Sequence, residues 1–160
     1  MHEHEAPSQA LQPLAFLLGH FYGEGHYVER PGSFQKEVTG VWEANGRFIS
    51  LRMGVNYPLL DGRNDCHQAL VIIGADPKTH ALESRAYTDG GFIFEHPMEL
   101  HNGALQFPDR PPGHGNKDSR ARKVLCPTAE GYEERLELEQ DNGAFAAYSI
   151  LLMRRVSSVS

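Results

Sequence analysis

The sequence predicts an all-β protein: an up-and-down antiparallel barrel of about ten strands, with one short N-terminal helix closing an end. Turn-forming residues recur about every ten residues after Gly19. Only residues 8–18 show helical spacing of apolar side chains. A sheet of ten strands with one helix can bury its apolar face only by closing on itself. We expect strands at residues 20–29, 35–44, 47–57, 65–74, 80–88, 92–100, 103–108, 119–126, 131–141 and 144–155.

Length and composition limit the classes of protein to consider. A chain of 160 residues with 40% hydrophobic and 22% charged residues is typical of one globular domain. The net charge of −6 disfavours a nucleic-acid partner. No apolar stretch is long enough to span a bilayer, and the acidic N-terminus lacks an export signal, which predicts a cytoplasmic protein without a membrane partner. We expect a flexible tail at residues 1–7 and a single barrel domain at residues 8–156.

The helix is expected to begin at Ser8, whose hydroxyl is a suitable N-cap, and to end before Gly19. Pro13 lies near its first turn. Its apolar face would comprise Leu11, Leu14, Ala15 and Leu18.

The Asn45-Gly46 turn sets the register of the first hairpin that can be resolved in detail. A two-residue loop pairs Ala44 with Arg47. Trp42 then shares the inner face with Ile49, and the charged side chains, including Arg52, lie on the outer face.

The Asn142-Gly143 turn sets the register of the last hairpin. Its register groups Tyr132, Glu134, Leu136 and Leu138 with Ala147, Ser149, Leu151 and Met153 on the inner face. The outer face is charged but also carries Tyr148, Ile150 and Leu152. Charged side chains can cover this apolar row, or the row can form a homodimer contact.

The Asp89-Gly90-Gly91 turn allows two registers. A two-residue loop would place Glu83 and Arg85 inside, whereas a three-residue loop places Leu82, Ser84 and Ala86 inside and sets Arg85 opposite Glu95. The second register buries apolar residues and pairs charges, so we prefer it. Phe92, Phe94, His96 and Met98 then line the interior.

The segment Leu14-Ala-Phe-Leu-Leu-Gly19-His-Phe21-Tyr-Gly23-Glu-Gly25 resembles the opening of nitrobindin-like and related bacterial lipocalin-like (calycin) domains. In that family a short helix leads into Leu-x-Gly-x-Trp-x-Gly-x-Gly on the first barrel strand. Phe21 stands where the family usually has Trp. The resemblance extends to the strand count over residues 11–155.

The resemblance implies a barrel whose cavity takes small hydrophobic ligands. In the nitrobindins the ligand is haem, held by a histidine close to the C-terminus, and the chemistry is nitric oxide binding and peroxynitrite isomerisation. This sequence departs from that pattern, because its last histidine is His114 and the final strand has none. A haem protein with a non-standard axial ligand is therefore the alternative to a cofactor-free binding protein.

The predicted inward residues form a mostly apolar lining with sparse polar groups, as small-molecule sites do. The aromatic candidates are Tyr27, Trp42, Phe94 and Tyr132, and the polar candidates are Gln68, His96 and Ser149. We expect a small hydrophobic or amphipathic ligand, whose polar end His96, Gln68 and Ser149 would orient. In the alternative, these side chains pack against each other and fill the barrel, leaving a structural or oligomerisation role.

His96 has three possible roles. It can form a hydrogen bond with a neighbour such as Ser84, contact a ligand, or bind a metal ion. The sequence has no nucleophile motif and no zinc-like histidine or cysteine spacing, so we expect neither a catalysed reaction nor a metal. Arg122 can face the cavity together with Val124 and Cys126, but the nearby Pro127–Gly131 turn leaves this register open.

Overall fold

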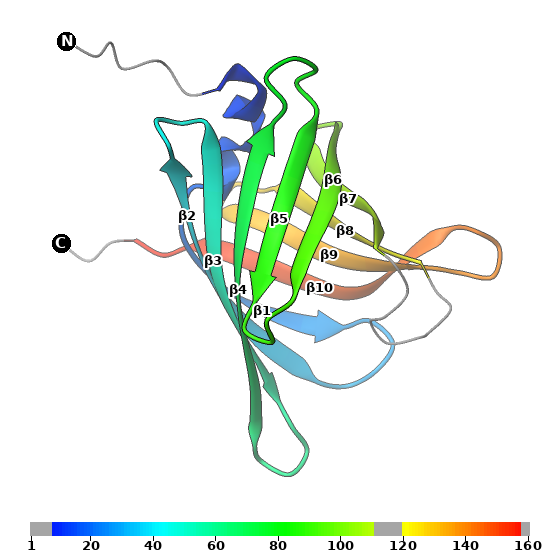
Figure 1. The fold of residues 1–160 in the computed structure, drawn as a ribbon. Helices are drawn as coiled ribbons and strands as arrows, with labels where there is room; N and C mark the ends of the chain where they lie inside the picture. Colours follow the sequence, from blue (N-terminus) through cyan, green and yellow to red (C-terminus); the bar gives the residue numbers. More distant parts are fainter. Residues whose placement is uncertain (1–7, 111–119, 158–160) are drawn as a thin grey trace.

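The computed structural model describes residues 8–110 and 120–157 and confirms the predicted architecture (Figure 1). Ten antiparallel strands form a closed barrel, in which each strand neighbours the next in sequence and β1 pairs with β10. The elements are η1 (Gln9–Leu17), β1 (Gly19–Tyr27), β2 (Ser33–Glu43), β3 (Phe48–Pro58), β4 (Asn64–Ala75), β5 (Leu82–Thr88), β6 (Ile93–His101), β7 (Ala104–Arg110), β8 (Ala121–Pro127), β9 (Gly131–Glu139) and β10 (Phe145–Arg155). The predicted tail at residues 1–7 lies outside the described residues.

Two of the three predicted hairpin registers match the observed strand pairing, although Ala44 and Arg47, which were expected to pair, lie within the β2–β3 turn. Trp42 pairs with Ile49 across β2 and β3, and Arg52 is exposed on the outer face. Arg85 pairs with Glu95 across β5 and β6, as the three-residue loop requires. The side chains at these turns therefore specified which face of each strand is buried.

The β9–β10 hairpin departs from the prediction near its turn. Ser149 pairs with Leu136 as expected, but a bulge between Ala147 and Ser149 shifts the rest, so that Ala147 pairs with Glu137. Tyr148 is the extra residue of the bulge, and its ring packs edge-on against Tyr27 with centroids 5.6 Å apart. Tyr148 therefore does not belong to the predicted outward apolar row, which is reduced to Ile150 and Leu152.

The N-terminal helix closes one end of the barrel, as predicted, but it is a 3₁₀ helix (Figure 1). Its buried side chains are Leu11, Leu14 and Leu17, which follow the three-residue period of that helix. The expected face was wrong in part, because Ala15 is exposed. This helix, the only one in the described part of the chain, is not long and apolar enough to cross a membrane.

The helix end of the barrel is filled by side chains. The ring of Phe21 packs edge-on against that of Tyr132, with centroids 5.1 Å apart. Arg155 donates a hydrogen bond of 2.5 Å to the carbonyl oxygen of Leu18, where the helix ends. The backbone N–H of Ser8 donates to the carbonyl of Gly46 at 2.8 Å and ties the start of the helix to the β2–β3 turn. Ser8 makes no capping bond through its side chain.

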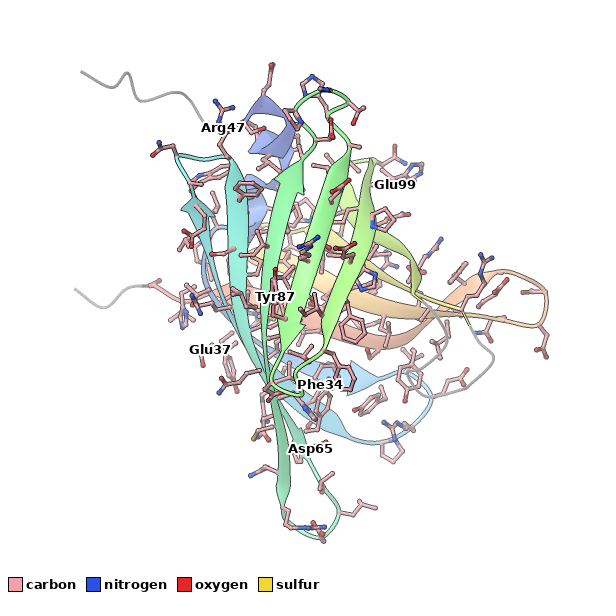
Figure 2. The ribbon with its side chains drawn as sticks, in the orientation of Figure 1. Phe34, Glu37, Arg47, Asp65, Tyr87 and Glu99 are labelled. Carbon is pink, nitrogen blue, oxygen red and sulfur yellow. The ribbon has the colours of Figure 1, made fainter. Side chains whose placement is uncertain are left out.

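The opposite end of the barrel is not covered by a helix of the described residues. Because η1 leads directly into β1, Gly19 lies at the helix end and Tyr27 at the other end, which we call the open end. The β3–β4 hairpin, which carries Asp65, extends beyond the open end (Figure 2).

Substitution of Gly40 tests how closely the end of η1 packs against β2. A Cβ at Gly40 would overlap the carbonyl oxygen of Leu17, whereas a Cβ at Gly54 would meet nothing. We expect Gly40→Ala to lower the free energy of unfolding by about 1–3 kcal/mol, because the helix must shift. Gly54→Ala, the control on the adjacent strand, should change it by less than about 1 kcal/mol. Urea denaturation midpoints measure both, and equal midpoints would contradict this account.

Candidate functional site: the open half of the barrel

Four of the seven predicted site residues lie toward the open end. Tyr27 ends β1 and Ser149 is near the start of β10, and the two are cross-strand partners. Phe94 and His96 lie near the start of β6, which begins at the same end. Ser149 is buried, while Tyr27 and His96 are half-buried.

Trp42 and Tyr132 face the interior but lie at the helix end. Trp42 is near the end of β2 and packs against the core. Tyr132 is buried between Phe21 and Phe16, whose ring centroid is 6.1 Å away. Burial, together with the nearby charge of Glu134, raises the pKa of the Tyr132 hydroxyl above its usual range. These two residues belong to the packing of the closed end, away from the other four.

The expected inward facing of Gln68 is wrong. Gln68 pairs with Gly54 and is exposed, while its neighbour Ala69 faces inward beside Met53. Its backbone N–H donates to the Asp89 carboxylate at 2.9 Å, which ties β4 to the β5–β6 turn.

A row of aromatic side chains lines the open end. Tyr27 lies 5.5 Å from Phe34, and Phe34 lies 5.4 Å from Tyr57, measured between ring centroids. Figure 2 shows Phe34 at the end of the barrel away from the helix. A Cβ at Gly25 would overlap the Phe34 ring, so the second glycine of the Gly-x-Gly motif makes room for this ring. The guanidinium of Arg30 lies 3.8 Å from the Tyr27 ring centroid, a cation–π contact at the rim.

A second aromatic row runs along β6. The rings of Phe92, Phe94 and His96 are stacked, with successive centroids 6.1 Å apart. Phe94 and His96 occupy the inner face, as predicted, yet Phe94 is 38% exposed and Phe92 is 64% exposed. Ser84 donates a hydrogen bond to the backbone carbonyl oxygen of His96 at 3.4 Å, and not to the imidazole that it was expected to satisfy.

A charged triad, which the sequence analysis did not identify, lies inside the barrel. The Lys36 ammonium is 2.7 Å from Glu134 Oε2, and the Lys123 ammonium is 2.9 Å from Glu134 Oε1. The side chains of Lys36, Glu134 and Lys123 are 5%, 12% and 20% exposed, respectively. The alternation of inward and outward residues along β2 could have identified Lys36 as an inward residue, because it shares its face with the buried Phe34 and Val38.

The triad determines the ionisation of its carboxyl group. Burial alone would raise the pKa of Glu134, but the charges of Lys123 and Lys36 and their hydrogen bonds outweigh it and hold that pKa far below its usual range. Glu134 is therefore ionised at neutral pH.

Arg122, whose facing was left open, lies on the outer side of β8. It pairs with Glu137, with Nη2 and Oε2 3.1 Å apart, and its guanidinium lies 4.3 Å from the Phe145 ring centroid. Lys123, the next residue, is the cation that faces inward.

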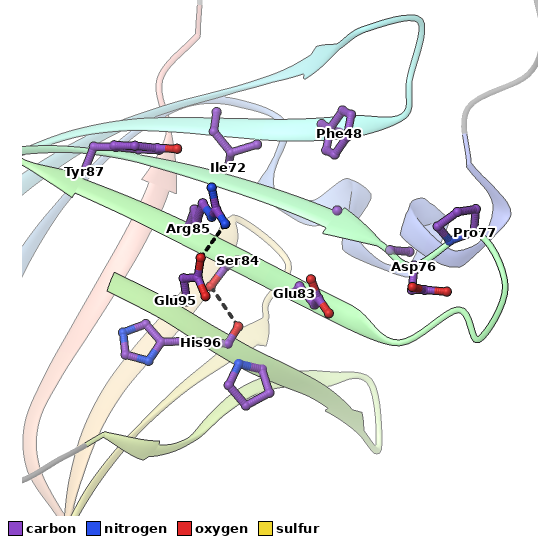
Figure 3. Close-up of a pocket in the computed structure, with 13 residues that line it drawn as sticks. Phe48, Ile72, Asp76, Pro77, Glu83, Ser84, Arg85, Tyr87, Glu95 and His96 are labelled. Atoms are coloured by element: carbon purple, nitrogen blue, oxygen red, sulfur yellow. Dashed lines mark hydrogen bonds and ion pairs between the residues drawn. The ribbon is translucent and has the colours of Figure 1, made fainter. Parts of the chain in front are cut away.

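A groove of about 780 Å³ lies on the outer face of β3–β6 (Figure 3). Its apolar wall includes Phe48, Ile72 and Tyr87, and the Arg85–Glu95 ion pair crosses it. Ser84 and His96 are also among its lining residues, and it contains none of the triad.

The residues present do not fit the histidine-ligated haem of the nitrobindins. The inward positions of β10 are Ser149, Leu151 and Met153, and no position of this strand is a histidine. The haem alternative therefore stays a prediction, with His96 as the inward-facing histidine of β6. Among residues 8–110 and 120–157, no cluster of three or more His, Cys, Asp or Glu side chains is arranged to hold a metal ion, and Cys66 and Cys126 are free thiols.

Comparison with known proteins supports the fold alone. No protein-family model matches the chain, and no curated protein matches it. Among solved structures, the chain is similar to the crystal structure of Rv2717c from M. tuberculosis, with a TM-score of 0.62 and 14% identity. That likeness covers 94% of this chain and 99% of the other. Together with the closed ten-stranded barrel, it fits a calycin-like fold.

Removing the carboxylate of the triad should destabilise the barrel. Glu134→Gln removes the negative charge that both the Lys36 and the Lys123 ammonium groups contact, and we expect a loss of about 3–5 kcal/mol in the free energy of unfolding. The control is Glu133→Gln, which removes the neighbouring outward carboxylate that pairs with Arg135 at 3.0 Å, and it should cost at most about 1 kcal/mol. Urea denaturation at pH 7 measures both, and similar losses would argue against a buried triad.

The triad should also shape the stability of the protein in acid. Because the pKa of Glu134 is lower in the folded chain than in the unfolded chain, its contribution is complete above the unfolded value of about 4.3. That contribution is lost as the pH falls below this value. The free energy of unfolding should therefore fall less steeply in acid for Glu134→Gln than for Glu133→Gln. Denaturant titrations from pH 7 to pH 3 provide the comparison, and parallel curves would refute it.

Proposed function

We propose that the barrel binds a small hydrophobic or amphipathic molecule in its open half. The observation that carries this proposal is the placement of aromatic side chains on the inner face, with solvent access. Phe94 faces inward and is 38% exposed, which is unusual for a large apolar side chain on a barrel's inner face.

Three further features support this choice of site. The helix end is packed with side chains, so a ligand would enter elsewhere. The inward positions Ala69 and Ala86 in the open half carry small, half-buried side chains. The lining combines aromatic rings with a few polar groups, the composition typical of small-molecule sites. The resemblance to lipocalin-like domains is consistent with this role.

Phe94 and its neighbour Ile93 make a matched test. Both are exposed apolar residues of β6, but Ile93 faces outward. With the uncharged fluorophore N-phenyl-1-naphthylamine, we expect Phe94→Ala to raise Kd about tenfold, which corresponds to about 1.4 kcal/mol of lost contact. Ile93→Ala should stay within about twofold of the parent protein. Fluorescence titration measures Kd, and native mass spectrometry of untreated protein would identify any co-purified molecule.

The proposal fails if the fluorophore does not bind the parent protein. It also fails if Ile93→Ala weakens binding as much as Phe94→Ala, because the dye would then be bound at the outer surface.

A further inference from the structure

The groove on the outer face of β3–β6 has an apolar part and an acidic part. Ile72 and Tyr87 contribute to the apolar part, and Tyr87 is 38% exposed. Asp76 and Glu83 lie toward the other end, where Phe48 is also found (Figure 3). An occupant that matches this groove therefore has an apolar portion next to a group that carboxylates attract.

Apolar side chains of this size are unusual on the outer face of an antiparallel barrel, where positions that face water are normally polar. Ile72 and Leu70 both point outward from β4, and Tyr87 is the cross-strand partner of Leu70 on β5. The ring of Phe48 is 42% exposed and lies over Gly74, where a Cβ would come within 2.7 Å of it. Contiguous exposed apolar surface of this kind marks an interaction site.

The charged side chains that line the groove are mostly negative. Asp76, Glu83 and Glu95 face a single positive charge, that of Arg85, so the formal net charge of the lining is −2. Arg85 is paired with Glu95 across β5 and β6. Asp76 and Glu83 are therefore the source of the excess negative charge.

These two carboxylates are suited to receive a cation. The backbone N–H groups of Lys78 and Thr79 each donate to Asp76 Oδ1 at 2.8 Å and lower the pKa of Asp76, which is ionised at neutral pH. Glu83 is exposed and forms no ion pair with any residue that the structure describes. Carboxylates near an aromatic ring such as that of Phe48 attract lysine and arginine side chains.

A second groove extends this surface on the same outer face. Its volume is about 510 Å³, and it shares Tyr87 with the first groove. The charged residues in its lining are Glu37, Arg52 and Asp89, which bring the formal net charge of the two linings together to −3. Two grooves that meet at one residue form an elongated surface, which suits a chain segment better than a compact molecule.

Charge distinguishes between the occupants that such a surface could take. A second copy of the chain, whose formal net charge is −6, would bring like charge to the surface. We propose that this outer surface binds a basic segment of a partner protein, with a lysine or arginine side chain at Asp76 and Glu83 and an apolar side chain on Ile72 and Tyr87. The proposal does not depend on what the barrel binds inside.

The first test compares two fluorescein-labelled peptides of about eight residues, a length that spans about 27 Å when extended. One peptide has two leucines flanked by lysines, and the other has glutamine in place of each lysine. We expect the lysine peptide to bind about tenfold more tightly in fluorescence anisotropy at low ionic strength. Equal affinities, or no binding of the lysine peptide, overturn the proposal.

Variants at the acidic end then test the position of the lysine side chain. Glu83→Gln should weaken binding of the lysine peptide about fivefold and change that of the glutamine peptide by less than about twofold. The control is Glu139→Gln, which removes the same charge from β9, four strands away, and should change neither. Equal losses in the two variants overturn the proposal, because the peptide would then respond only to overall charge.

A variant at the apolar end tests the other contact. Tyr87→Ala should weaken binding of both peptides about fivefold, whereas Tyr22→Ala, which removes a 50% exposed tyrosine from β1, should change neither. Equal effects of these two variants count against the proposed position of the apolar side chain and overturn it. Circular dichroism checks the fold, and Ile72→Thr replaces Tyr87→Ala if the latter does not fold.

Two further measurements test the other occupants. If the parent protein sediments as a dimer that Tyr87→Ala converts to a monomer, a second copy occupies the surface and the proposal is overturned. If butylamine displaces the lysine peptide at concentrations close to the Kd of that peptide, the site takes small amines and the proposal is overturned as well. A monomeric parent protein and weak competition by butylamine are the expected results.

Discussion

Closure of the sheet between its first and last strands is the constraint on which the rest of this structure depends. Closure brings the backbones of β1, β10 and β9 close together, and glycine makes this possible. A Cβ at Gly23 would overlap the carbonyl oxygen of Leu152, and one at Gly131 would overlap that of Met153. The Gly-x-Gly motif of β1 is therefore a packing requirement of the barrel seam, with Gly25 accommodating the Phe34 ring.

Closure also gives the barrel two unlike ends. The 3₁₀ helix buries three leucine side chains at one end. The carbonyl oxygen of Leu17 lies against Gly40, and that of Leu18 accepts a hydrogen bond from Arg155. This end of the barrel is therefore filled by packed side chains. The proposed ligand site lies in the other half, whose lining includes the aromatic rings of the open end, Ser149 and the triad. The β6–β7 pairing is short and extends only through residues 99–101 and 104–106.

The sequence was sufficient for the strand order and most of the register because its turns are chemically explicit. Asn45-Gly46 and Asp89-Gly90-Gly91 fixed the faces of four strands. Gln68 was misplaced because β4 is apolar on both faces, with Leu70 and Ile72 outside and Val71 and Ile73 inside, so alternation gave no direction. The bulge at Tyr148 and the 3₁₀ period of the helix depend on tertiary packing, which local spacing does not report.

Lys36 shows a different limit of reasoning from composition. Hydrophobic patterning treats a lysine as a surface residue, yet the neighbours of Lys36 on its face, Phe34 and Val38, are buried. The lysine is tolerated there because the Glu134 carboxylate pairs with its ammonium group. Apolar residues of similar volume generally stabilise a core at least as well as a buried ion pair does. The triad is therefore not explained by the need for a stable barrel.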